Sequence, residues 1–188
     1  MFENKNNDKG PFLWKKFVNG DDEAFSLLYH NYIEEMFAYG SCFLSDSELV
    51  KDFIQDIFVN IYNRKNVIKA EHPKFYLLKA LKNQIINYYR DQKEFSPIKD
   101  NFNFICNESS VEDNFIKNEK EKLLSKHISV LLNQLTKRQK EAIYLKYIEE
   151  MPNKEIAIIM QMNQQSVQNL IQRSLSKLRN TIDINNYI

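Results

Sequence analysis

Hydrophobic positions in the first half of the chain recur every three or four residues, as they do in helices that bury one face. The first such stripe follows Asp21, a favourable N-cap residue, and the second follows Ser45 or Asp46. A third begins at Pro73, in the first-turn position that proline favours, and continues to about Lys93. The three stripes consist of Phe25, Leu28, Tyr29, Tyr32, Ile33 and Met36; Leu49, Val50, Phe53, Ile54, Ile57, Phe58 and Ile61; and Leu77, Leu78, Leu81, Ile85, Ile86 and Tyr89.

The helical rhythm is lost from Phe95 to Asn114, where Pro97 and several Asn and Ser residues predict an interdomain linker. This segment is too apolar for a simple spacer. Its large apolar side chains either dock on a partner or pack on the chain's own domains, and the sequence favours neither alternative. They are Phe95, Phe102, Phe104 and Ile105.

The second half of the chain returns to helical spacing. We expect a helix over residues 116–135, and Thr136 with Gln139 forms a capping-box pattern that begins the next helix. No stretch alternates with a period of two, so we predict an all-α fold. It consists of two helical domains, 11–94 and 116–183, joined by a flexible linker, 95–115.

Near the C-terminus the pattern predicts a helix-turn-helix. A short helix, Asn153–Met160, and a longer one from about Gln164 to Asn180 flank a break at residues 161–163. Ala157 is the small residue required where the helices cross, and Val167 would hold the second helix in place. The turn usually carries Gly, and a non-Gly residue there must adopt a left-handed conformation at some energetic cost.

The outward face of the last helix is rich in amides. Gln and Asn can pair with adenine in the major groove and Arg can pair with guanine, whereas Lys177 and Arg179 suit phosphates. The alternative is a solvated face on an ordinary helical hairpin. The candidate base-reading residues are Gln164, Gln165, Gln168, Asn169, Gln172 and Arg173.

Two further helix faces carry candidate chemistry. Asp52, Gln55 and Asp56 share one face and suit protein docking, although a metal site, acid–base chemistry or plain solvation are alternatives. From Tyr76 to Arg90, bases and aromatic residues alternate as in sites for single-stranded nucleic acid, although helical cores also hold Tyr.

Composition excludes several other classes of protein. The net charge is +1, but residues 21–56 hold nine acids against one lysine, whereas residues 74–93 and 136–180 are basic. This asymmetry suggests more than one kind of partner, although charge alone favours the alternative of ordinary solvated helix faces. The two cysteines have no CxxC spacing, so we expect reduced thiols and no metal site. No signal peptide and no apolar run long enough for membrane insertion are present, so a cytoplasmic location is expected.

The order of these motifs resembles that of extracytoplasmic-function (ECF) sigma factors of the sigma-70 family, across roughly residues 13–179. Asp52, Gln55, Asp56 and Phe58 match the family's region 2.2 pattern D-x-x-Q-[DE]-x-F. The segment with Tyr76, Leu77, Asn83, Tyr88 and Arg90 resembles its W-L…N…D-Y-L-R segment, with Tyr76 replacing Trp and Asn87 replacing Asp. Residues matching region 4 are Gln139, Glu141, Tyr147, Glu155, Ile156, Ala157, Ser166, Val167, Arg173, Leu178 and Arg179, whereas Pro152-Asn153 and Gln168 depart from it.

The resemblance implies functions for the three faces. Asp52, Gln55 and Asp56 would bind core RNA polymerase. The second face would recognise and melt the minus-ten promoter element through Tyr76, Lys79, Lys82, Asn83, Asn87, Tyr88 and Arg90. The last helix would read the minus-thirty-five element through Gln164, Gln165, Ser166, Gln168, Asn169, Gln172, Arg173 and Lys177.

The resemblance also implies what the chain does not need. A sigma factor carries out no catalysis and binds no cofactor or metal, because the polymerase supplies both. Its partners would be core RNA polymerase, promoter DNA and, in many cases, an anti-sigma factor. The alternatives are a stand-alone helix-turn-helix regulator and a helical adaptor that does not bind DNA.

Overall fold

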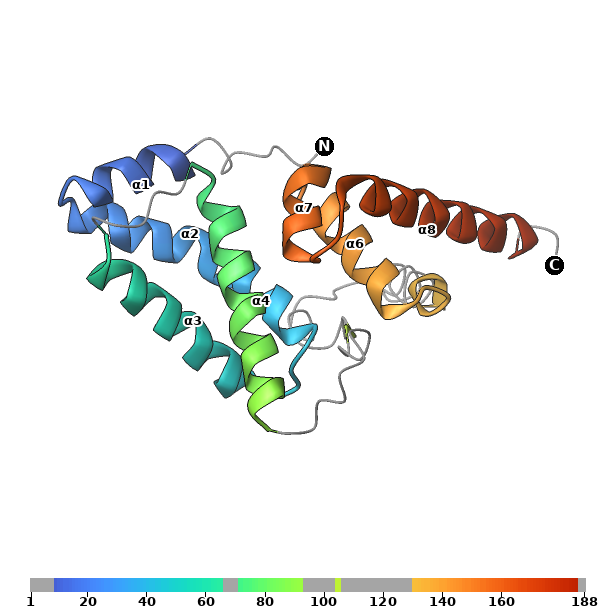
Figure 1. Cartoon of the computed structure of the whole chain (residues 1–188), viewed down its shortest axis with the longest axis horizontal. Coiled ribbons are helices and arrows are strands. Elements are labelled where there is room, and N and C mark those ends of the chain that lie inside the picture. Colours follow the sequence, from blue (N-terminus) through green and yellow to red (C-terminus); the bar gives the residue numbers. More distant parts are fainter. Residues whose placement is uncertain (1–8, 66–70, 93–103, 106–129, 186–188) are drawn as a thin grey trace, which may run out of the picture. The chain divides into compact units, whose positions relative to one another are not determined.

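The computed structural model describes residues 9–65, 71–92, 104–105 and 130–185. Within these ranges the chain forms seven α-helices and no strand, in two compact units that divide between Ser96 and Pro97 (Figure 1). The predicted all-α fold with two helical domains is therefore confirmed. Most of the predicted linker and residues 116–129 of the helix expected over 116–135 lie outside the described residues.

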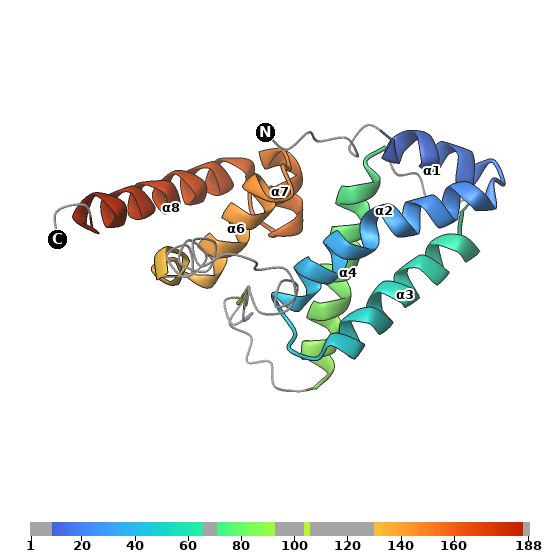
Figure 2. The same ribbon diagram turned by 180° about the vertical axis from the view of Figure 1, so that it is seen from behind.

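Unit 1 is a bundle of four helices: α1 (Gly10–Val18), α2 (Asp22–Ser41), α3 (Ser47–Asn63) and α4 (Pro73–Asp91). Helix α2 packs against each of the other three (Figures 1 and 2). The core between them consists of the apolar stripes predicted from the sequence, with Leu28, Ile54 and Leu81 almost completely buried. The three long helices are as predicted, whereas α1 was not expected.

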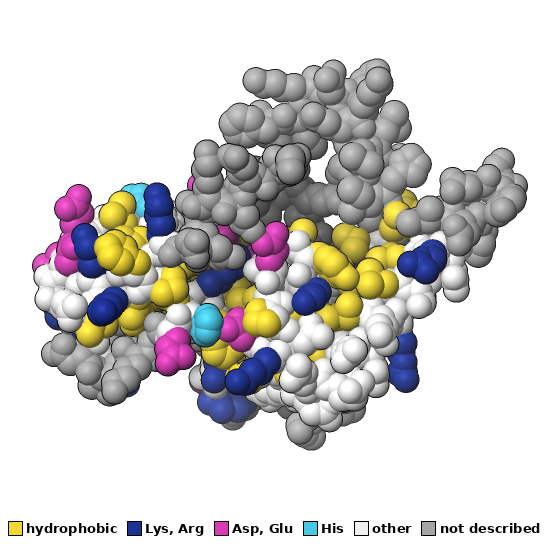
Figure 3. Space-filling view, turned by 90° about the horizontal axis from the view of Figure 1, so that it is seen from above, with side chains coloured by type: hydrophobic (Ala, Val, Ile, Leu, Met, Phe, Trp, Pro, Cys, Tyr) yellow, Lys and Arg dark blue, Asp and Glu magenta, His cyan; other side chains and the backbone are white. Residues whose placement is uncertain are grey.

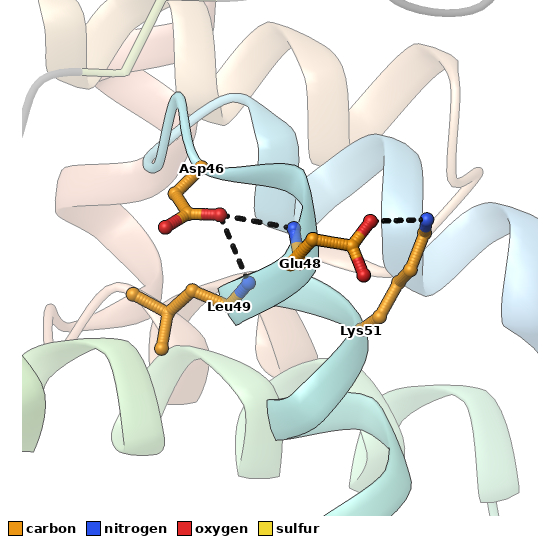
Figure 4. Close-up of polar contacts among 4 residues, drawn as sticks. All are labelled: Asp46, Glu48, Leu49 and Lys51. Atoms are coloured by element: carbon orange, nitrogen blue, oxygen red, sulfur yellow. Dashed lines mark hydrogen bonds and ion pairs between the residues drawn. The ribbon is translucent and has the colours of Figure 1, made fainter.

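Aspartate side chains begin two of these helices. Asp21 Oδ1 accepts a hydrogen bond from the Ala24 amide at 3.0 Å at the start of α2. Asp46 Oδ1 accepts from the amides of Glu48 and Leu49 at 3.0 and 3.2 Å, so Asp46 and not Ser45 caps α3 (Figure 4). Each cap satisfies amides that a helix N-terminus leaves without a partner, and such a cap stabilises a helix by about 1 kcal/mol.

The end of α2 packs directly against α3. A β-carbon added at Gly40 would lie 2.7 Å from Cγ1 of Val50, so a side chain at this position would require its surroundings to shift. Both residues are buried. Gly40 therefore sets how closely the two helices approach each other.

One lysine belongs to the core of unit 1. Lys82 of α4 is only 5% exposed, and its Nζ lies 5.6 Å from the ring centroid of Phe43. The Tyr89 hydroxyl donates a hydrogen bond to the Phe43 carbonyl at 2.7 Å, so α4 holds the segment after α2 at two points. The alkyl stem of a lysine packs like an apolar side chain while its ammonium group lies over an aromatic face.

The expectation that the cysteines are reduced is wrong for Cys42. This residue at the end of α2 is buried and disulfide-bonded. Its partner lies outside the described residues. Separation along the sequence does not determine distance in the fold, so the lack of a CxxC pattern could not exclude this bond.

Unit 2 contains α6 (Lys137–Tyr147), α7 (Asn153–Ile159) and α8 (Gln164–Asn185), with α6 and α7 both packed on α8. The predicted capping box is confirmed: the Thr136 hydroxyl accepts from the Gln139 amide, and the Gln139 side chain accepts from the Thr136 amide. The helices share a small apolar core that includes Ala142, Leu145, Ile156, Val167 and Ile171.

The turn between α7 and α8 has the predicted left-handed residue. Gln161 has φ +52°, and hydrogen bonds from the Met162 amide to the Ala157 carbonyl and from the Gln161 amide to the Ile158 carbonyl close α7 in a Schellman motif. Asn163 Oδ1 then accepts from the Ser166 amide at 2.7 Å and starts α8. The helix-turn-helix is thus built as expected, although α8 continues past the predicted end near residue 180.

We expect Lys82→Ala to lower the free energy of unfolding of unit 1 by about 2 kcal/mol, because it removes three methylene groups worth about 0.8 kcal/mol each when buried. Urea unfolding followed by the fluorescence of Trp14, the only tryptophan, reports on this unit. The control is Arg90→Ala, which removes an exposed cation from the same helix. Equal effects of the two substitutions would contradict a packing role for Lys82.

We expect Gln161→Gly to stabilise unit 2 by about 1 kcal/mol, because glycine removes most of the steric cost of a left-handed residue. Amide hydrogen exchange of α7 and α8 measures this change separately from unit 1. Gln161→Ala is the matched control, since it shortens the side chain but retains the β-carbon that causes the strain. A gain in both variants would mean that the strain is not the cause.

Candidate nucleic-acid interface

The outer surface of α8 presents the predicted polar set. All of its amide-bearing candidates and both of its basic candidates are exposed, whereas Ser166 is half-buried. Val167, Ile171 and Ser174 lie on the opposite side, where they are at most 6% exposed. The exposed residues are Gln164, Gln165, Gln168, Asn169, Gln172, Arg173 and Lys177.

The geometry of the turn determines how this surface is presented. Ala157 and Ile156 of α7 are buried, so α7 covers one side of α8 and leaves the amides free to face a ligand. Gln165 Nε2 donates to Asn169 Oδ1 at 3.1 Å, which orders two neighbouring amides along the helix. Further along, a shallow hollow follows the outer side of α8, lined by Asn169, Gln172, Arg173, Ser176, Lys177 and Asn180.

The candidate residues of α4 fall into three groups. Asn83, Asn87 and Arg90 are exposed and follow one another at helical spacing along a single stripe. Tyr76, Lys79 and Tyr88 are half-buried, and Lys82 is in the core. An accessible strip of two amides and one guanidinium therefore runs along α4, bordered by aromatic side chains.

Tyr76 joins this strip to α1. Its ring lies 5.7 Å from that of Trp14, which is 4% exposed. Burial raises the pKa of the Tyr76 hydroxyl, and the nearby Arg64 lowers this pKa by a smaller amount, so the phenol stays neutral at physiological pH. A neutral, partly exposed ring can stack on a base without repelling a phosphate.

The acidic face of α3 lies on the solvent side of unit 1. Asp52, Gln55 and Asp56 are exposed, and the residues beside them in sequence, such as Phe53 and Ile57, point into the core. Gln84 Nε2 of α4 donates to Asp56 Oδ2 at 3.3 Å, which links this face to the helix that carries the exposed amides.

Beside Gln55 lies an apolar hollow that the sequence analysis did not identify. It is formed by α2 and α3 and is lined by Phe25, Tyr29, Gln55, Phe58, Val59, Tyr62 and Asn63. Val59 and Tyr62 are 50% and 42% exposed. The available signal was the spacing of Gln55, Val59 and Tyr62, which places two apolar side chains on the same side of α3 as the polar candidates.

On the face shown in Figure 3, most basic side chains lie among hydrophobic and uncharged ones. Over the described ranges, no group of three or more His, Cys, Asp or Glu is placed to hold a metal ion, and no helix is long and apolar enough to span a membrane. The three polar faces are thus the principal candidates for binding in the part of the chain that the structure describes.

Comparisons with known proteins find similarity in sequence and in fold. Residues 127–178 match the family model for region 4 of sigma-70. The ECF RNA polymerase sigma factor SigM of Bacillus subtilis (strain 168) is 22% identical over 152 residues, which are 81% of this chain and 91% of SigM. In the solved structure of CnrH in complex with the cytosolic domain of CnrY, a chain with 19% identity matches at a TM-score of 0.58, over 94% of this chain and 99% of that one.

The likeness to the solved structure concerns the fold, and the two sequence matches concern the family. The match to region 4 covers the helix-turn-helix, and the similarity to SigM extends over most of both chains. Residues 127–178 thus form a sigma-70 region 4, and over most of its length the chain is similar to an ECF sigma factor.

Proposed function

We propose that this chain binds core RNA polymerase and directs it to specific promoters, where it starts transcription. The observation that carries this proposal is the helix-turn-helix of unit 2, which presents seven exposed amide and basic side chains on one side of α8. A regulator of this family acts without catalysis of its own and without a cofactor. This role also assigns the chain to the cytoplasm, where polymerase and chromosome meet.

In this proposal α8 lies in the major groove of the minus-thirty-five element. Residues near the start of such a helix reach base edges first, so Gln164, Gln165 and Gln168 would contribute most to sequence preference. Asn169, Gln172 and Arg173 would follow, and Lys177 would contact a phosphate. Ser166 is half-buried, and its amide is bonded to Asn163, so it would help to position the helix.

The exposed strip of α4 would contact the minus-ten element. Asn83 and Asn87 can hydrogen-bond to unpaired bases, and Arg90 can follow the backbone. Tyr76, Lys79 and Tyr88 lie at the edge of the core, where a ring can replace the stacking that a base loses when the duplex opens. Lys82 is left out of this surface because its ammonium group lies over Phe43.

The acidic face of α3 would dock on the polymerase. By resemblance to the family, its target is the coiled coil of the largest subunit. Asp52 and Asp56 offer negative charge, and the hollow beside Gln55 offers apolar contact, so the surface suits a helix with basic and apolar residues. Such a mixed surface can bind strongly without a metal or a cofactor.

A protein that holds the factor inactive is a further expected partner. CnrH, which shares the fold, has been solved in complex with the cytosolic domain of CnrY. We propose that this chain can likewise be bound by an anti-sigma factor. The test is co-purification with the products of neighbouring genes, followed by release upon addition of core polymerase.

Transcription in vitro from a promoter library, with core polymerase and with or without this protein, tests the main proposal. A sigma factor produces transcripts with shared upstream motifs only when both proteins are present. A stand-alone regulator would bind duplex promoter DNA without polymerase, and an adaptor would show no salt-dependent affinity for DNA. Either of these outcomes, without dependent transcripts, would overturn the proposal.

For docking, we expect Asp52→Arg to reduce co-purification with core polymerase at least tenfold, because reversing a charge within an interface costs more than about 1.4 kcal/mol. Unit 1 should remain folded, since Asp52 is exposed. The matched control is Glu34→Arg, the same charge reversal at an exposed acid of α2. Binding that is equally retained, or equally lost, in both variants would remove α3 from the interface.

For base reading, we expect Gln168→Ala to relax preference at one or two adjacent promoter positions, by about 1–3 kcal/mol for each lost bidentate contact. Lys177→Ala should instead weaken binding to all sequences and lower the salt slope by about one unit. Sequencing the transcripts from the library measures the first effect, and titration of the polymerase complex at several salt concentrations measures the second. An unaltered upstream motif with Gln164→Ala, Gln165→Ala and Gln168→Ala would exclude α8 as the reader.

A further inference from the structure

The start of α4 has a charge of the wrong sign for a helix N-terminus. Lys74 is the second residue of this helix, after Pro73, and the first turn contains no acidic residue. The backbone amides at a helix N-terminus carry partial positive charge, so a cation there is unfavourable and an anion is favourable. In addition, the side chain of the N-cap residue His72 makes no capping hydrogen bond. The start of α4 therefore depends on negative charge from another part of unit 1.

Glu35 of α2 supplies this charge. Its Oε2 lies 3.3 Å from Lys74 Nζ, and the side chains of Glu35 and Lys74 are 38% and 16% exposed. By contrast, the side chains of Lys51 and Glu48, which form an ion pair within α3, are 58% and 77% exposed. Water and salt screen a partly buried pair less, and removal of one partner leaves the other charge poorly compensated. The Glu35–Lys74 ion pair is therefore a connection between α2 and α4 that solvent does not easily replace.

The same side of α2 also holds α1. Tyr32 lies three residues before Glu35, so the two side chains share one side of the helix. Tyr32 is 5% exposed, and a β-carbon added at Gly10, the first residue of α1, would overlap its hydroxyl group. Burial raises the pKa of Tyr32 to about 12, and the nearby Glu35 carboxylate contributes to this rise, so the hydroxyl stays neutral at physiological pH. Two neighbouring positions of α2 thus hold the starts of α1 and α4.

The two helices meet at a ring that the proposed function places at the edge of the minus-ten surface. Tyr76 follows Lys74 by two residues, and its ring lies 5.7 Å from that of Trp14 in α1, with the ring planes at 59°. Trp14 is 4% exposed, whereas Tyr76 is half-buried and so offers part of its ring to solvent. Helices α1 and α4 contact each other (Figure 1). The position of this ring therefore depends on both helix starts being fixed.

We infer that Lys74 is a positioning residue: its ion pair with Glu35 holds the Tyr76 ring against Trp14, where the ring can stack on a base as the duplex opens. The inference rests on the proposed function, because it assumes that Tyr76 takes part in opening the minus-ten element. The competing role for Lys74 is a direct contact with a DNA phosphate, which its charge and its place in the basic block 74–93 would also suit. A phosphate contact does not need Glu35, whereas the positioning role does.

Two substitutions that each remove one charge distinguish these roles. Lys74→Met and Glu35→Gln should both slow open-complex formation about fivefold or more, the loss expected for one stacked base, without weakening the closed complex. Permanganate reactivity of unpaired thymines measures the opening. Glu34→Gln, at the exposed neighbour of Glu35, is the matched control and should have no effect. The double substitution Glu35→Lys with Lys74→Glu reverses the ion pair and should restore most of the opening rate.

A phosphate contact predicts a different pattern. Lys74→Met would then weaken the closed complex and lower its salt slope by about one unit, Glu35→Gln would leave opening unchanged, and the reversed pair would not recover. That pattern would overturn the inference. A promoter with a mismatched minus-ten element needs no opening, so both single variants should use it as well as the unaltered chain does. An equal loss on paired and mismatched promoters would mean general damage to unit 1 and would also overturn the inference.

The position of Tyr76 can be measured without polymerase, because Trp14 is the only tryptophan. Quenching of its fluorescence by acrylamide should increase in Lys74→Met and Glu35→Gln, as in Tyr76→Leu, and should return to its original value in the reversed pair. Unchanged quenching in both single variants would overturn the inference whatever the transcription assay gives. Increased quenching in a chain that supports no dependent transcription would instead leave the positioning intact and count against the proposed function.

Discussion

Each helix of this protein must bury one apolar stripe, and that constraint determines which side chains are left to bind partners. In α3, the burial of Phe53 and Ile57 leaves Asp52, Gln55 and Asp56 outside. In α8, the burial of Val167 and Ile171 leaves the amides outside. The candidate binding surfaces therefore consist of the side chains that the two cores leave exposed. Any change that rotated a helix would turn its polar face away from the partner.

Unit 1 carries two such faces on neighbouring helices. The acidic face belongs to α3 and the amide strip to α4, and the Gln84–Asp56 hydrogen bond crosses between these helices. Lys82, in the middle of α4, and Tyr89, near its end, both hold the helix to Phe43. In the proposed function, a rigid α4 would help to open DNA, because the rings of Tyr76 and Tyr88 could replace lost base stacking only if the helix that carries them stays in place.

Much of this arrangement could be predicted from the sequence because it depends on local chemistry. The caps at Asp21, Asp46 and Thr136, the three long stripes and the turn at Gln161 all follow from residues close together in the chain. Helix α1 was missed because its nine residues give few repeats of a helical pattern and, unlike the shorter α7, it belongs to no recognisable helix-turn-helix motif. Lys82 was interpreted by its charge, although it lies four residues after Leu78 and three before Ile85 and so continues their buried stripe. The burial of Phe104 against Tyr144 of α6 and the disulfide bond of Cys42 depend on contacts between segments that are distant in the sequence. The periodicity of apolar residues cannot reveal such contacts.

Two non-glycine residues on either side of α7 are in the left-handed region: Glu150 before it and Gln161 after it, with φ of +55° and +52°. Each costs about 1–2 kcal/mol relative to an unstrained residue. A destabilisation of this size raises the fraction of unfolded molecules several-fold, and it is the unfolded fraction that cellular proteases degrade. Backbone strain on both sides of α7 therefore lowers the stability of unit 2, the unit that carries the proposed DNA-reading helix.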